Sequence, residues 1–238
     1  MTDVPRLSKG SSDHFRGGAS PAVSAFVAWW QDAVNLVFPP RCAGCGRVDT
    51  DWCHRCQQET AHNLPILNLH HLSGLDGCAA SGRHEGKLQD AVQALKYENA
   101  RSLAHPFALR LRDCLLTLSW TFDTIIPVPI GTARLKERGY NQAGLIAAAL
   151  AQEVGVATHP HYIWRDRETR SQVGLNAAER HENVEGAFRA DPALAGRSVL
   201  LVDDVYTTGA TLAACAEAVR TAGALQVYAL TVTAAHSQ

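Results

Sequence analysis

Several features that would assign this sequence to a common class are scarce or missing. Its 238 residues carry 22 Lys and Arg against 23 Asp and Glu, so the formal net charge is −1 and no basic excess is available to coat nucleic acid. Only four of the 22 basic residues are Lys. The Arg bias suits phosphate contacts, but a GC-rich genome explains it equally well, and we favour that explanation.

Long apolar segments are missing as well. No uninterrupted apolar run approaches the roughly 18 residues that a membrane span needs, so we expect no membrane span. Residues 1–20 are polar and lack the apolar core of a signal peptide. These absences predict a cytoplasmic protein in which any nucleic-acid contact is confined to a local patch.

The composition is that of a folded chain, with 46% hydrophobic and 19% charged residues. We expect a disordered tail over residues 1–20, an amphipathic helix and a cysteine cluster within 21–60, and one main domain over 75–238. The expected helix, residues 22–38, ends at Pro39 and Pro40. Its apolar stripe either packs on the main domain, which we favour, or grips a partner.

The main domain alternates strand and helix patterns. Apolar strands are expected at 124–128, 199–202 and 225–232, and helices at 102–118, 141–155 and 211–222. Asn141 is a suitable N-cap and Gly155 a suitable stop for the second helix. Strands that are apolar on both faces and separated by helices predict an α/β fold, with a parallel sheet covered on both sides.

Four of the seven cysteines fall within fifteen residues, as two C-x-x-C pairs formed by Cys42, Cys45, Cys53 and Cys56. Four thiolates at this spacing suit a tetrahedral structural Zn²⁺ site. A set of reduced thiols or a redox pair is the alternative. The remaining three, Cys78, Cys114 and Cys215, are expected to be small buried residues.

The segment VLLVDDVYTTGAT, residues 199–211, carries the clearest functional signal. An apolar strand leads to Asp203 and Asp204, and a Gly-containing turn then opens a helix whose N–H groups and hydroxyls can hold a phosphate. The acids would repel that phosphate, so they suit ribose-like hydroxyls or a Mg²⁺ ion. No Gly-Lys-Ser/Thr ending is present, which excludes a Walker loop. The alternative is an acidic strand end before an ordinary helix.

This segment resembles the phosphoribosyl pyrophosphate (PRPP) signature of type I phosphoribosyltransferases. The resemblance implies that fold, with Asp203 and Asp204 as the catalytic acids on the ribose. It places the 5′-phosphate on the turn made of Thr207, Thr208, Gly209, Ala210 and Thr211.

Further stretches narrow the resemblance to the ComF family of competence-related proteins. They are PVPIGTARLKERGYNQ at 127–142, RETRSQVGLNAAERHENVEGAF at 167–188, PPRCAGCG at 39–46 and the triplet Leu95-Lys96-Tyr97. Together they span about residues 36–233. The family implies a small N-terminal zinc-binding module and a role in natural transformation. Single-stranded DNA and DNA-uptake proteins are then the expected partners.

Pyrophosphate needs a second anion site opposite the first. We expect it at the turn formed by Val128, Pro129, Ile130 and Gly131, with Arg138 close behind. The alternative is a Pro-rich turn with solvated basic residues.

The stretch 165–183 lacks periodicity and is interpreted as a flexible lid, from which Arg170, Gln172 and Arg180 would reach the site. An ordinary surface loop is the alternative. An acceptor-binding hood is expected within 77–97.

The main hypothesis is a Mg²⁺-dependent, PRPP-binding protein that transfers phosphoribose to an unidentified acceptor. A non-catalytic PRPP sensor or single-stranded-DNA adaptor is the second hypothesis, and a nucleobase salvage enzyme is the third.

Overall fold

The computed structural model describes residues 39–69, 72–167, 184 and 186–235. The predicted tail (1–20) and the predicted helix (22–38) lie outside these residues. Residues 40–235 of the described part belong to one compact unit. No helix among them is long and apolar enough to cross a bilayer.

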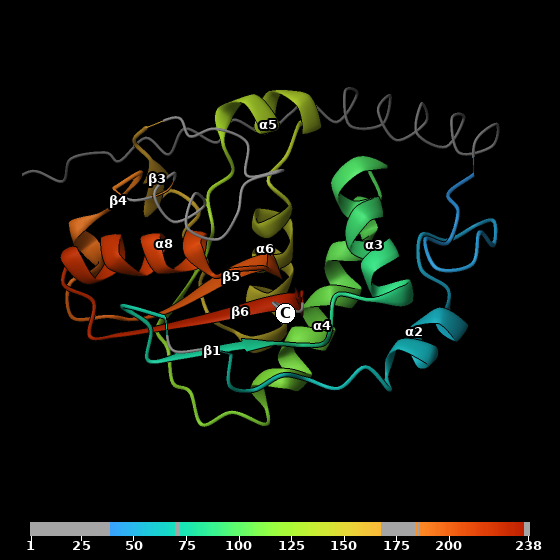
Figure 1. Cartoon of the computed structure of the whole chain (residues 1–238), viewed down its shortest axis with the longest axis horizontal. Coiled ribbons are helices and arrows are strands. Elements are labelled where there is room, and N and C mark those ends of the chain that lie inside the picture. Colours follow the sequence, from blue (N-terminus) through green and yellow to red (C-terminus); the bar gives the residue numbers. More distant parts are fainter. Residues whose placement is uncertain (1–38, 70–71, 168–183, 185, 236–238) are drawn as a thin grey trace, which may run out of the picture. The chain divides into compact units, whose positions relative to one another are not determined.

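A four-stranded parallel sheet organises the described chain (Figure 1). Its order is β1-β6-β5-β2, formed by Gly77–Ala80, Gln226–Ala234, Ser198–Tyr206 and Thr124–Pro127. All three strand pairs are parallel, as the run of apolar strands predicted. The two central strands, β5 and β6, are buried along almost their whole length.

Helices cover both faces of the sheet (Figure 1). On one face, residues such as Leu200 and Val202 pack with α3 (Gly86–Tyr97), α4 (Ala104–Leu115) and α6 (Gln142–Val154). On the other face, Val199 and Leu201 pack with α8 (Ala210–Thr221). The 3₁₀ turns Arg101–Leu103 and Pro192–Leu194 complete these layers.

Local sequence signals fix the ends of α6 as predicted. The Asn141 side chain accepts a hydrogen bond from the backbone N–H of Ala143 at 3.1 Å, and Gly155 ends the helix with φ at +69°. Inside the helix, Ile146 and Leu150 are fully buried against the sheet. Capping and apolar spacing therefore agree at this element.

The strand expected at 199–202 is too short, because β5 runs from Ser198 to Tyr206. Its pairing with β6 continues through Asp203↔Thr231 to Tyr206↔Ala234. Both acids therefore lie within the strand, and the loop begins only after Tyr206. Hydrogen bonding to a neighbouring strand overrides the low strand propensity of Asp here.

Among the elements without a prediction are four small ones. They are α2 (His54–Thr60), α5 (Thr132–Arg138), and the antiparallel pair of β3 (Ile163–Arg165) with β4 (Phe188–Ala190). α5 contains no buried residue, so no apolar periodicity marked it.

The cysteine-bearing segment packs directly into the main core. Cys42, Trp52, Cys53 and Cys56 belong to the same buried cluster as the inner faces of α3 and α4. The Trp52 ring meets the Phe107 ring edge-on, with centroids 5.6 Å apart. The core is therefore shared between the segment and the sheet domain.

Candidate functional site

A cavity of about 620 Å³ opens at the carboxyl ends of β2 and β5. Parallel α/β sheets bind ligands at this edge. The cavity is lined by residues from β5, the turn after β2, α5 and the C-terminal end of α3. Segments far apart in the chain therefore meet in one place.

The loop after β5 is built around Gly209. Its φ of +77° is left-handed, and a Cβ added there would lie 2.4 Å from Leu72 Cδ1, so only glycine fits. The backbone N–H of Ala210 donates to the Thr208 hydroxyl at 3.4 Å as α8 begins. Of the five predicted phosphate residues, Thr207 and Thr211 line the cavity, and the other three form the turn that positions them.

The two acids reach the cavity from opposite faces of β5, because successive side chains of a strand alternate. Asp204 is 4% exposed and lies on the α3 side, where Lys96 Nζ is 3.0 Å from its Oδ1. Its Oδ2 is buried and has no hydrogen-bond partner among the described residues. An unpaired buried carboxylate oxygen is costly, so this atom is suited to a ligand hydroxyl or a cation.

Asp203 lies toward α8 and β3. Its Oδ1 accepts a hydrogen bond from the backbone N–H of Asp204 at 2.8 Å. Burial raises the pKa of Asp203 to about 7, and the charge of Asp204 adds to the rise. Two adjacent carboxylates that resist ionising together fit a site completed by a positive or hydrogen-donating ligand.

The turn after β2 forms the opposite wall, and Val128, Pro129, Ile130 and Gly131 all line the cavity. The backbone N–H of Val128 donates to Val202 O at 2.9 Å, which fixes the start of the turn to β5. Helix α5 follows immediately and brings Arg138 to the cavity, with its guanidinium 5.3 Å from the Tyr97 ring centroid. Every residue predicted for the pyrophosphate site is therefore on this wall.

Residues outside the predicted ribose, phosphate and pyrophosphate sets complete the lining of the cavity. The added charged and aromatic side chains are His84, Lys96, Tyr97, Arg134, Glu137 and Arg165. Lys96 and Tyr97 had a signal in the family triplet, whereas the only signal for His84 was its place in the segment 77–97 expected to bind the acceptor. His84 is positioned by sheet pairing, because it follows β1 and its N–H bonds to Ala234 of β6. The predicted lid residues Arg170, Gln172 and Arg180 lie outside the described residues.

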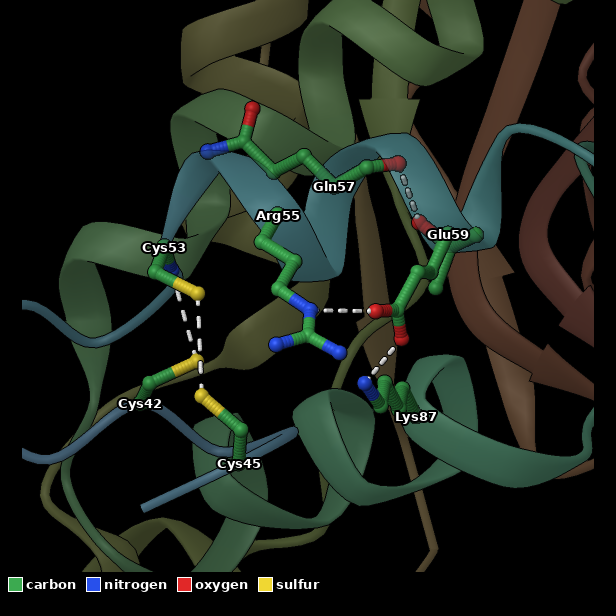
Figure 2. Close-up of polar contacts among 8 residues, drawn as sticks. Cys42, Cys45, Cys53, Arg55, Gln57, Glu59 and Lys87 are labelled. Atoms are coloured by element: carbon green, nitrogen blue, oxygen red, sulfur yellow. Dashed lines mark hydrogen bonds and ion pairs between the residues drawn. The ribbon is translucent and has the colours of Figure 1, made fainter. Parts of the chain in front are cut away.

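The four clustered cysteines are brought together as predicted. All four sulfur atoms lie within 4.8 Å of one another, and Cys45 Sγ is 3.7 Å from Cys53 Sγ. Figure 2 shows three of these residues, Cys42, Cys45 and Cys53. A tetrahedral Zn²⁺ with Zn–S bonds of about 2.3 Å places its sulfurs about 3.8 Å apart. The arrangement can therefore hold a metal ion such as zinc.

Hydrogen bonding prepares one of these thiols for deprotonation. Burial alone would raise the pKa of Cys42, but backbone hydrogen bonds from Cys53 and Gly44, with smaller contributions from the neighbouring thiols, lower it to about 6. The bond from the Cys53 N–H measures 3.3 Å. Burial, helped by the other thiols, raises the pKa of Cys56 to about 12. The two thiols therefore differ in how readily they lose a proton. A bound cation would favour deprotonation of both, because it stabilises all four thiolates.

Charged side chains lie on one side of the cluster (Figure 2). Glu59 accepts from Arg55 Nε at 2.8 Å and pairs with Lys87, which belongs to α3. The Lys87 stem also packs on Gly44, whose added Cβ would lie 3.2 Å from Lys87 Cβ. The cluster is thus tied to the same helix that carries Lys96 to the cavity.

The other three cysteines are buried, as predicted. Burial raises the pKa of Cys78 to about 12 and that of Cys114 to about 11, and it raises that of Cys215 as well. They are therefore inert core residues.

Comparison with known proteins agrees with this geometry. Residues 115–238 match the phosphoribosyl transferase domain. The chain is 30% identical to competence protein F of Haemophilus influenzae over 231 residues, which covers 91% of this chain and 94% of that protein. It is 35% identical to the DNA utilization protein YhgH of Escherichia coli K12, over 79% of this chain and 87% of that one.

A solved adenine phosphoribosyltransferase from Thermoanaerobacter pseudethanolicus is a more distant neighbour. It is 18% identical, with a TM-score of 0.36 over 59% of this chain and 83% of that one. The domain match and the long sequence relatives establish the assignment. The chain has the type I phosphoribosyltransferase fold and belongs to the ComF family of competence-related proteins.

Proposed function

We propose that this protein binds PRPP together with Mg²⁺ and transfers the phosphoribosyl group to an acceptor during the use of incoming DNA. One observation carries the proposal. Asp204, whose buried Oδ2 has no partner among the described residues, lines a cavity that the loop after β5 and the turn after β2 also line. A phosphorylated sugar with a second anionic group matches all three features.

The residues divide the work according to their chemistry. Asp203 and Asp204 would accept hydrogen bonds from the ribose hydroxyls, and the Thr207–Thr211 loop would hold the 5′-phosphate at the N-terminus of α8. The turn Val128–Gly131 and Arg138 would hold the pyrophosphate. Arg138 would stabilise the negative charge that develops on pyrophosphate as it leaves C1 of the ribose.

The donor set also fits Mg²⁺, which prefers carboxylate and phosphate oxygens. When bound, Mg²⁺ would neutralise part of the pyrophosphate charge. Zinc is the metal we propose for the cysteine cluster, because four thiolates within 4.8 Å of one another suit it. Its role there would be structural, since four cysteines leave no open coordination position.

The link to DNA rests on the relatives, two of which are named competence protein F and DNA utilization protein. We propose the same setting for this chain, in the cytoplasm, with single-stranded DNA and DNA-uptake proteins as partners. A protein that binds PRPP without releasing pyrophosphate would instead be a PRPP sensor or a DNA adaptor. A nucleobase salvage enzyme is the other outcome of the test below.

Titration calorimetry with PRPP and Mg²⁺ tests the site. Asp204→Asn keeps the shape of the side chain but removes its charge, so we expect it to weaken binding by about 10–100-fold, the value of a hydrogen bond to a charged group. Asp113→Asn, on an exposed carboxylate, is the matched control and should bind like the wild type. Absence of PRPP binding by the wild type would refute the proposal.

Two further measurements separate the alternatives. Pyrophosphate release with a panel of nucleobases and oligonucleotides distinguishes a transferase from a binder. Salt-dependent binding of single-stranded DNA that persists in Asp204→Asn would favour the adaptor.

A further inference from the structure

His84 lines the cavity, but the proposed function gives it no role. It follows β1, and its backbone N–H donates to Ala234 O at 2.8 Å, so it extends the edge of the sheet beside β6. Its half-buried side chain lines the cavity together with Lys96 and Asp204. The residue lies in the segment expected to bind the acceptor, on the side away from the turn after β2.

A hydrogen-bond chain orients the His84 ring. Its Nδ1 lies 2.8 Å from the hydroxyl oxygen of Thr233, which is completely buried. That hydroxyl donates to the carbonyl oxygen of Asp204 at 3.4 Å, so its oxygen is free to accept from Nδ1–H. Nε2 then carries the lone pair, and it has no partner among the residues that the structure describes.

The charges around His84 favour its neutral form. Burial lowers its pKa, the positive charge of Lys96 from α3 lowers it further, and Asp204 from β5 opposes the change more weakly. Thr233, the contact from β6, is uncharged. The ring is therefore a neutral proton acceptor at physiological pH, beside the carboxylate that would hold the ribose.

Phosphoribosyl transfer requires such a group. As the acceptor atom bonds to C1, the bond from C1 to the pyrophosphate oxygen breaks and its electron pair leaves with pyrophosphate. The acceptor must then lose the proton that it carried on that atom. Lys96 and the arginines of the cavity are donors with no acceptor lone pair, and the two aspartates are committed to the ribose in the proposed function. The other carboxylate of the lining, Glu137, lies on α5, the helix that carries Arg138 to the proposed pyrophosphate site.

We propose that His84 is the catalytic base of this protein, with Nε2 accepting the proton that the acceptor loses. The inference rests on the proposed function. It also limits the acceptor to a group with an N–H or O–H at the reacting atom.

The experiment compares His84→Asn with the wild type and with His105→Asn. Asn can still donate to Thr233 from near the Nδ1 position, but it has no group at the Nε2 position. His105, a largely exposed histidine that pairs with Glu153, is the matched control. Calorimetry should give all three proteins the same affinity for PRPP and Mg²⁺ within about twofold, which also shows that the variants fold.

Pyrophosphate release is then followed from pH 5.5 to 9 with a panel of nucleobases and short single-stranded oligonucleotides. We expect His84→Asn to lower kcat by about 10²–10⁴-fold and to abolish the decline in rate on the acid side of the wild-type profile. His105→Asn should keep both. Added imidazole should partly restore the rate of His84→Ala in proportion to its free-base concentration.

Each outcome decides the matter. An unchanged kcat and acid limb in His84→Asn would overturn the assignment of His84 and leave the proposed function intact. PRPP binding without pyrophosphate release at any pH would overturn the assignment and leave a binding protein. Absence of PRPP binding by the wild type would overturn both.

Discussion

The ion pair between Lys96 and Asp204 should contribute strongly to stability, and Lys96→Met tests this directly. Lys96 Nζ is 3.0 Å from Asp204 Oδ1, and the two side chains are only 19% and 5% exposed. Oδ2 of the same carboxylate already has no partner among the described residues. Removal of the lysine would therefore leave both oxygens of the buried Asp204 carboxylate without the positive charge that α3 supplies.

The size of the effect follows from this burial. Removing one partner of a buried ion pair costs about 3–5 kcal/mol. Lys96 keeps some contact with water through the cavity, so we expect the lower end, about 3 kcal/mol. In a protein of this length that corresponds to a fall in Tm of about 6–12 °C. Lys96→Arg should lose much less, because it keeps the charge.

Urea unfolding followed by tryptophan fluorescence measures the free energy of unfolding of each variant. Arg189→Met, which breaks the exposed pair between Arg189 and Asp166, is the control and should lose less than about 1 kcal/mol. Asp204→Asn in the Lys96→Met background should recover part of the loss, because the buried charge is gone. A loss of less than about 1 kcal/mol in Lys96→Met would refute the reasoning.

Three further predictions concern the loop, the cysteines and pH. Gly209→Ala should cost about 2–4 kcal/mol in urea unfolding, because it combines left-handed strain with a clash against Leu72, and it should also weaken PRPP binding. Cys45→Ser should lose about one equivalent of zinc by metal analysis, and retained metal would count against the four-thiolate site. The raised pKa of Asp203, about 7, means that the folded state keeps a proton that the unfolded state releases above pH 4, so stability should fall from pH 4 to 7. Urea unfolding of Asp203→Asn across this range should remove that decline, and an equal decline in the variant would contradict it.

The parts of the site predicted from the sequence are those encoded by contiguous residues. The loop after β5, the turn after β2 and the two C-x-x-C pairs each carry their chemistry within a short segment, and the structure brings each together. The fold was predictable for the same reason, since apolar runs and caps such as Asn141 act locally.

The missed parts depend on contacts between distant segments. The sequence marks Lys96 only as part of the family triplet Leu95-Lys96-Tyr97. Its ion pair with Asp204 requires α3 to pack on the sheet. The proximity of His84 to Thr233, 149 residues later, depends on the pairing along β6. The end of β5 was misplaced because strand pairing, rather than the propensity of Asp, determines how far the strand continues. No local pattern encodes these contacts.

The pairing of β1 with β6 joins an early part of the domain to its last described strand. Ser81, which follows β1, donates its hydroxyl hydrogen bond to Val232 O across 151 residues of sequence. During synthesis, β1 must therefore wait for its partner β6 until residues 226–234 have left the ribosome, whereas the cysteine pairs can meet as soon as residue 56 emerges. A nonsense mutation or cleavage after α8 would spare every site residue predicted from the sequence. It would still leave β1 without β6 and His84 without Thr233, so the formation of β6 decides whether the cavity is completed.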